Sequence, residues 1–145
     1  MYDVEILETL QKGIIAAVEA SDMPTPHAGR IQMVGLTFEP PADGKYLEVV
    51  FIPNNGDDQH WGDEKNYRGM LRLILHWPID TQGPYPPMRV LKSVCAYFAK
   101  DEPLRLPDNL ASVVQISNTP NSLAPLAQGG EALYPASLRY QSFRS

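Results

Sequence analysis

The chain has 145 residues, a length that fits one domain with one sizeable core. Its apolar fraction of 43% and charged fraction of 20% are those of an ordinary globular protein, and its net charge of −5 argues against a general nucleic-acid binder, which needs clustered lysine and arginine. The lone cysteine, Cys95, excludes an intrachain disulfide and fits a reducing compartment.

The N-terminal segment predicts a helix rather than a signal peptide. Asp3, Glu5 and Glu8 interrupt the stretch where a signal peptide would be basic and then apolar. Over residues 3–20, apolar residues recur at helical spacing and form one stripe. The stripe consists of Val4, Leu7, Leu10, Ile14 and Val18. No run approaches the roughly 18 apolar residues of a membrane span, so we expect a soluble protein made and kept in the cytoplasm.

Two strands are predicted before the middle of the chain. Residues 30–38 favour a short strand, and residues 45–53 favour a clear one, because the second segment is rich in β-branched and aromatic residues and ends at Pro53. The polar segment NNGDDQHWGDEKN follows, and it is longer than a typical hairpin connection.

This polar segment holds a cluster of acidic residues and one histidine. The cluster consists of Asp57, Asp58, His60, Asp63 and Glu64. Three interpretations stay open: a solvated loop, a contact with a partner, or a site for a divalent cation, although the spacing does not fit the EF-hand loop. Trp61 either folds back on the domain or fills a pocket on a neighbouring subunit.

The stretch NYRGMLRLILHWP, residues 66–78, is the most strand-like in the chain. One face of this strand is apolar, and we predict that it is buried; it carries Tyr67, Gly69, Leu71, Leu73, Leu75 and Trp77. The other face carries Arg68, Met70, Arg72, Ile74 and His76. That second face is a solvated sheet surface, a surface covered by the acidic loop of a neighbour, or a catalytic surface.

The second half of the chain predicts one helix and two strands. The helix spans residues 84–99, with Pro86 and Pro87 in its first turn. Its predicted stripe consists of Met88, Leu91, Val94, Cys95 and Phe98. Cys95 is interpreted as a small core residue rather than a reactive thiol.

Strands are predicted over residues 109–117 and 131–144, with a loop between them whose QGG sequence is a turn rather than a phosphate-binding loop. Pro135 lies inside the last strand and predicts an edge strand or a bulge there. The chain is therefore expected to be a single α+β domain over residues 1–145, a mostly antiparallel sheet with two main helices packed on it in the order α-β-β-α-β-β.

No catalytic motif is present in the sequence. The chain lacks G-x-S-x-G, a Walker loop, G-x-G-x-x-G and H-E-x-x-H, and its three histidines, His27, His60 and His76, stand far apart. We therefore expect no enzyme, no cofactor and no metal. In LRYQSFR, residues 138–144, Arg139 lies on the face opposite Leu138; this segment is either a half-buried edge strand or an edge offered to another chain.

Four segments in this order resemble those of a known family. They are FIPN (51–54), YRGMLRLILHWP (67–78), YFAKDEPL (97–104) and LYPASLRYQSF (133–143). Over roughly residues 3–144, the chain resembles the tail terminator proteins of long-tailed phages, and its layout is similar to that of the lambda minor tail protein that caps the tail tube.

The resemblance implies a structural virion protein, assembled in the bacterial cytoplasm. Members of this family form α+β domains that assemble as a hexameric ring on the last ring of tail tube subunits, end tail polymerisation and present a surface to the head-side connector. They need no cofactor and no membrane, and DNA is only passing cargo. The expected subunit or partner interface consists of Asp57, Asp58, His60, Trp61, Asp63, Glu64, Arg68, Arg72 and Arg139.

Two other functions stay open from the sequence. A head–tail connector or neck protein would share the size and the oligomeric habit of a terminator. A small metal-assisted hydrolase would use the 57–64 segment, and a metal that binds its folded state would raise its melting temperature.

Overall fold

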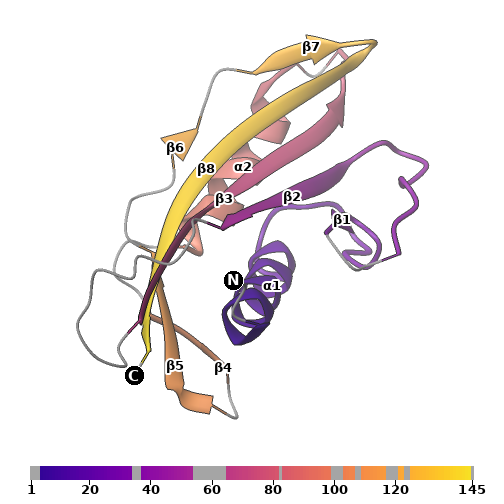
Figure 1. Ribbon diagram of the computed structural model, residues 1–145. Coiled ribbons are helices and arrows are strands. Elements are labelled where there is room, and N and C mark those ends of the chain that lie inside the picture. The colour runs from indigo at the N-terminus through magenta and orange to yellow at the C-terminus, as the bar shows by residue number, and fades with distance from the viewer. Residues whose placement is uncertain are drawn as a thin grey trace.

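A computed structural model describes residues 4–33, 37–53, 65–81, 83–98, 103–106, 109–116, 121–122 and 125–144. These residues form an α+β fold with two helices and one mostly antiparallel sheet, as the sequence predicted (Figure 1). The elements are α1 (Val4–Glu19), β1 (Ile31–Gln32), β2 (Tyr46–Pro53), β3 (Lys65–Pro78), α2 (Tyr85–Ala96), β4 (Pro103–Leu106), β5 (Asn109–Ile116), β6 (Asn121–Ser122), β7 (Leu126–Gln128) and β8 (Glu131–Arg144).

The sheet is built around its two long strands, β3 and β8. They pair antiparallel over their whole length, from Lys65 opposite Arg144 to Pro78 opposite Glu131. The strand order is β1-β2-β3-β8-β5-β4, and β6 and β7 also pair with β8. Only β1 and β2 run parallel among the described pairs.

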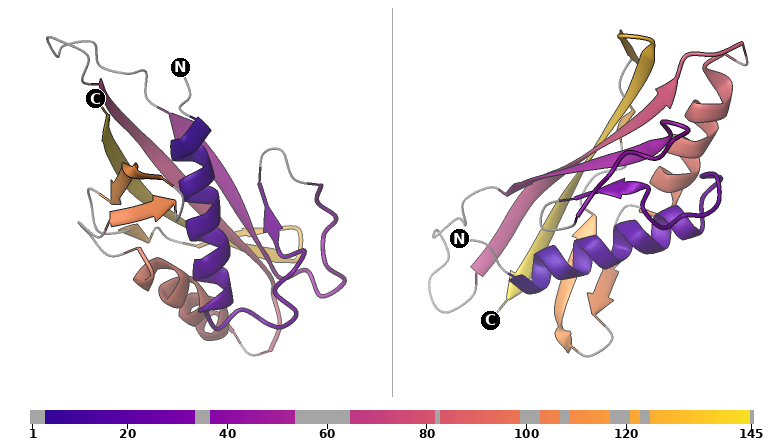
Figure 2. Two further views of the ribbon diagram at one scale, coloured as in Figure 1. Left: turned by 90° about the horizontal axis from the view of Figure 1, so that it is seen from below. Right: turned by 90° about the vertical axis from the view of Figure 1, so that its right-hand side faces the viewer.

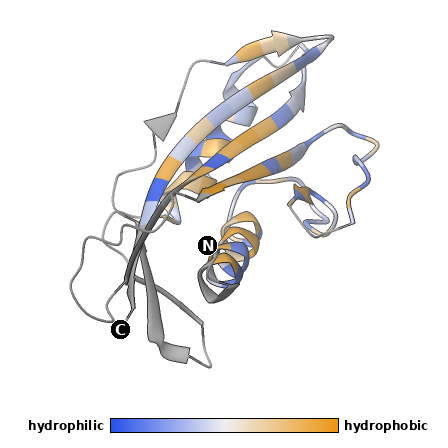
Figure 3. Cartoon of the chain, viewed as in Figure 1, coloured by the Kyte–Doolittle hydropathy of each residue, from blue (hydrophilic) through white to orange (hydrophobic). Residues whose placement is uncertain are grey.

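One face of this sheet, which we call the inner face, carries the hydrophobic core. On β3 the apolar face predicted from alternation is buried at Leu71, Leu73, Leu75 and Trp77. Both helices pack against the inner face, so α1, α2 and the sheet share one core (Figure 2). The alternation of hydrophobic and hydrophilic residues is visible along the long strands (Figure 3). Burial of this face is the main force that fixes the register of β3 and β8.

The apolar stripe of α2 differs from the predicted one. Met88 is 48% exposed, whereas Val90 is 3% exposed and takes part in the core. The buried residues recur at spacings of three and four along the helix and just beyond its end; they are Pro87, Val90, Leu91, Val94 and, after the helix, Phe98. Cys95 lies at the margin of this stripe and is half-buried.

Two further expectations about the strands were wrong, and one strand was not predicted. The strand predicted over 30–38 has only two described strand residues, Ile31 and Gln32. The loop predicted before the last strand contains β6 and β7, and β4 was not predicted. These strands have two to four residues, so they carry no periodic signal, and they exist because neighbouring strands supply their hydrogen bonds.

The expectation that Pro135 marks an edge strand was also wrong. β8 is an interior strand, and its pairing with β3 continues without a register shift through Pro135 opposite Ile74. On the other side of β8, the described pairing with β7 ends at Leu133 and the pairing with β6 resumes at Ala136. The register of β8 with these two strands differs by one residue on the two sides of Pro135, an irregularity of the kind that the bulge alternative predicted.

A buried arginine holds the segment between α1 and β2 in place. Arg30 is 6% exposed, and its Nε donates a hydrogen bond of 2.8 Å to the carbonyl of Pro26. Its Nη1 donates to Asp43 Oδ1 at 2.9 Å and to the carbonyl of Lys45 at 2.8 Å. Two carbonyl groups and one carboxylate from this segment thus accept hydrogen bonds from a single guanidinium.

Candidate functional site

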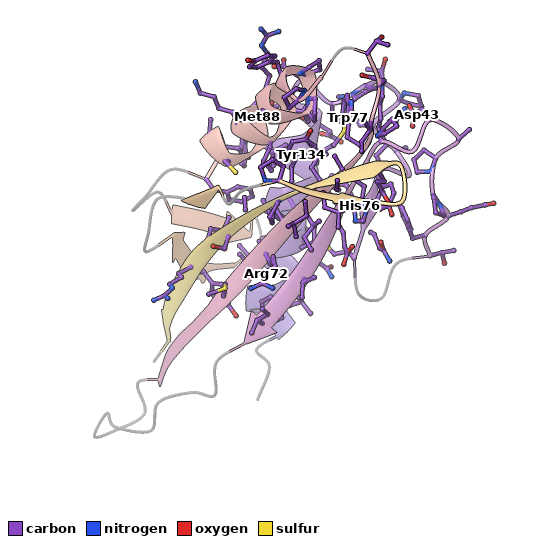
Figure 4. All side chains as sticks on the ribbon, turned by 90° about the horizontal axis from the view of Figure 1, so that it is seen from above. Asp43, Arg72, His76, Trp77, Met88 and Tyr134 are labelled. Atoms are coloured by element: carbon purple, nitrogen blue, oxygen red, sulfur yellow. The ribbon has the colours of Figure 1, made fainter. Side chains whose placement is uncertain are left out.

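The face of the sheet opposite the core, which we call the outer face, is the candidate functional surface. In the described part of the chain, both helices lie on the inner face, so neither covers the outer one (Figure 4). The strand register places the outer-face side chains in rows across β2, β3 and β8. Its residues are Tyr46, Glu48, Val50, Ile52, Met70, Arg72, Ile74, His76, Glu131, Leu133, Pro135, Ser137 and Arg139.

Apolar side chains occupy the middle and the edges of the outer face. Ile74 lies between Glu48 and Pro135 in the central row, and it is half-buried. Ile52 is 40% exposed. Leu126 of β7 pairs with Leu133, shares its face, and is 62% exposed. A contiguous, partly apolar sheet face of this kind is typical of a surface that binds another protein.

Two arginines mark one half of the outer face, which we call the basic half. Arg72 lies opposite Ser137, and Arg139 lies opposite Met70, one row further along. Both side chains are exposed, and neither has a hydrogen-bond or ion-pair partner among the described residues. The side chain of Arg68, predicted for the same face, lies outside the described part of the chain.

The other half, which we call the acidic half, is organised around His76. Its Nδ1 lies 2.6 Å from Glu131 Oε1, and its Nε2 lies 2.8 Å from Glu48 Oε1. The ring stacks on Tyr46 with 4.2 Å between centroids and 9° between planes. Burial, and then the charges of Glu131 and Glu48, raise the pKa of the Tyr46 hydroxyl. The network joins β2, β3 and β8 through their side chains.

This network is not a metal site. The two ring nitrogens of His76 point in opposite directions, toward Glu48 and toward Glu131, so the three groups do not converge on one ion. Within the described ranges, no group of three histidine, cysteine or acidic side chains is placed to hold a metal. The candidate cation ligands of the 57–64 segment lie outside those ranges.

The structure brings together only some of the residues predicted as an interface. Arg72 and Arg139 lie on the outer face of the sheet, in two neighbouring rows of that face. Asp57, Asp58, His60, Trp61, Asp63 and Glu64 lie outside the described residues. Glu48 and Glu131 were missed, although each sits at an outward position of a strand whose alternation was visible in the sequence.

Cys95 behaves as the sequence suggested. Burial raises the pKa of its thiol to about 11, so the thiolate that would act as a nucleophile is strongly disfavoured at neutral pH.

Comparison with known proteins identifies the family. A family model described as phage tail terminator protein matches residues 8–140, most of the chain and all of the outer face listed above. The chain belongs to the phage tail terminator family. A solved structure whose title states no function has the same fold, with a TM-score of 0.77 and 22% sequence identity over 98% of this chain and 96% of the other. No curated protein sequence matches the chain significantly.

Membership of the tail terminator family gives the chain a structural role in the phage tail and makes it a component of the virion. In that setting its partners are other tail or virion proteins. No described helix of this terminator is both long and apolar enough to cross a membrane.

Proposed function

We propose that the chain caps the phage tail tube as a ring, which the family resemblance makes hexameric, and thereby ends tail polymerisation. The completed ring then forms the surface to which the head-side connector joins. Residues 1–145 act as one terminator domain in this ring, without a cofactor, a metal, a membrane or a catalytic step. The match to the tail terminator family over residues 8–140 is the observation that carries the proposal.

A ring of identical subunits requires two different patches that meet around the circle. The basic half of the outer face, extended by Arg68, is one such patch, since Arg72 and Arg139 are exposed and unpaired among the described residues. The acidic 57–64 segment of the neighbouring subunit is the complementary patch. It offers Asp57, Asp58, His60, Trp61, Asp63 and Glu64. Opposite charges on the two patches favour one orientation of the neighbours.

The net charge of −5 also suits a ring through which DNA passes as cargo. Negative surfaces repel the phosphate backbone, so DNA that travels through the opening is not held there.

Replacement of Arg72 with Glu tests the ring contact. Because Arg72 is exposed, the variant should keep the melting temperature of the wild-type chain, whereas the reversed charge should abolish ring formation on tail tubes in electron micrographs. Arg89→Glu, an equally exposed reversal on α2, is the matched control and should leave the rings intact. Rings that persist in Arg72→Glu would remove this face from the contact.

Binding of the chain to purified tails and to purified heads distinguishes the proposed role from that of a neck protein. A terminator binds the end of the tail tube, whereas binding to heads alone would assign the chain to the head side of the joint.

A further inference from the structure

We draw no further inference here: the strongest candidate, the exposed stripe of α2 that carries Tyr85, Met88, Arg89 and Lys92, is a helix face turned away from the core, and nothing in the described part of the chain shows what covers it.

Discussion

Gly69 of β3 lies directly opposite Tyr140 of β8, and the tyrosine ring fills the space that a side chain would need. A Cβ at position 69 would stand 2.7 Å from Cε1 and 2.5 Å from Cζ of that ring. The ring has little room to move, because Tyr140 is 2% exposed and stacks on Phe51 with 5.5 Å between centroids. The close approach, rather than an unusual backbone angle, requires glycine here.

Gly69→Ala should therefore lower the free energy of unfolding by about 1–3 kcal/mol, the usual cost of an extra methyl group in a packed core. Urea denaturation measures the change. The same substitution in a Tyr140→Leu background should cost clearly less, because the clash is then relieved. Equal losses in both backgrounds would show that the tyrosine ring is not the cause.

Asp43 links stability to pH through Arg30. The hydrogen bond from Arg30 is the largest cause that lowers the pKa of the Asp43 carboxyl below its ordinary value of 3.8, and burial opposes it in part. A carboxyl with a depressed pKa in the folded state stabilises the fold above its unfolded pKa. That contribution is lost as the pH falls through the folded pKa.

Asp43→Asn should remove this contribution. The wild type should be more stable than the variant by about 1 kcal/mol at pH 7, since the carboxyl is partly exposed, and the difference should shrink as the pH falls below 3.8. Urea denaturation of both proteins from pH 7 down to pH 3 measures it. A difference that stays constant over this range would contradict the role of the ionised carboxyl.

Among the secondary-structure elements, β2, β3 and β8 are joined by the side chain of His76. With its ring removed in His76→Ala, Glu48 and Glu131 lose the partner that they share on β3. We expect a loss of about 1–3 kcal/mol in the free energy of unfolding, because two partly buried carboxylates are left without their hydrogen bonds.

Lys12→Ala is the matched control for this prediction. Lys12 lies 3.3 Å from Glu8 on α1, and the two side chains are 56% and 50% exposed, so the pair should contribute less than about 1 kcal/mol. Chemical denaturation of both variants compares the two contacts. A similar, small loss in His76→Ala would mean that the network adds no more than a surface ion pair.

The long elements could be predicted from the sequence because the apolar residues of each recur at the spacing typical of a strand or a helix. Alternation predicted β3 over 66–78 and β8 over 131–144, and the structure has them at Lys65–Pro78 and Glu131–Arg144. The short strands β4, β6 and β7 could not be predicted, since their existence depends on partners elsewhere in the chain. The position of β8 inside the sheet was missed for the same reason, since it depends on which strands pair with β8 and not on Pro135 alone.

The site was predictable only where it depends on a single strand. Alternation alone places Arg72 and His76 on one face of β3. The bond between His76 and Glu131 joins residues 55 positions apart, and it depends on the register between β3 and β8, which no local pattern contains.

For the whole molecule, both described helices pack on the inner face, so neither covers the other side of the sheet. A monomer would be expected to place polar residues throughout such a face, whereas this one carries Ile52, Ile74 and Leu133 between its charged groups. Membership of the tail terminator family gives that surface a context, since the partners of a phage tail component are other tail or virion proteins.

The polymerisation of tail tubes tests the proposed capping most directly. Tube protein from the same phage is polymerised with and without the chain, and the lengths and ends of the tubes are measured by electron microscopy. We expect growth to stop once the chain is added, with one ring on one end of each tube and with Arg72→Glu inactive. Tubes that grow to the same length with bare ends in the presence of the wild-type chain would contradict the proposed function.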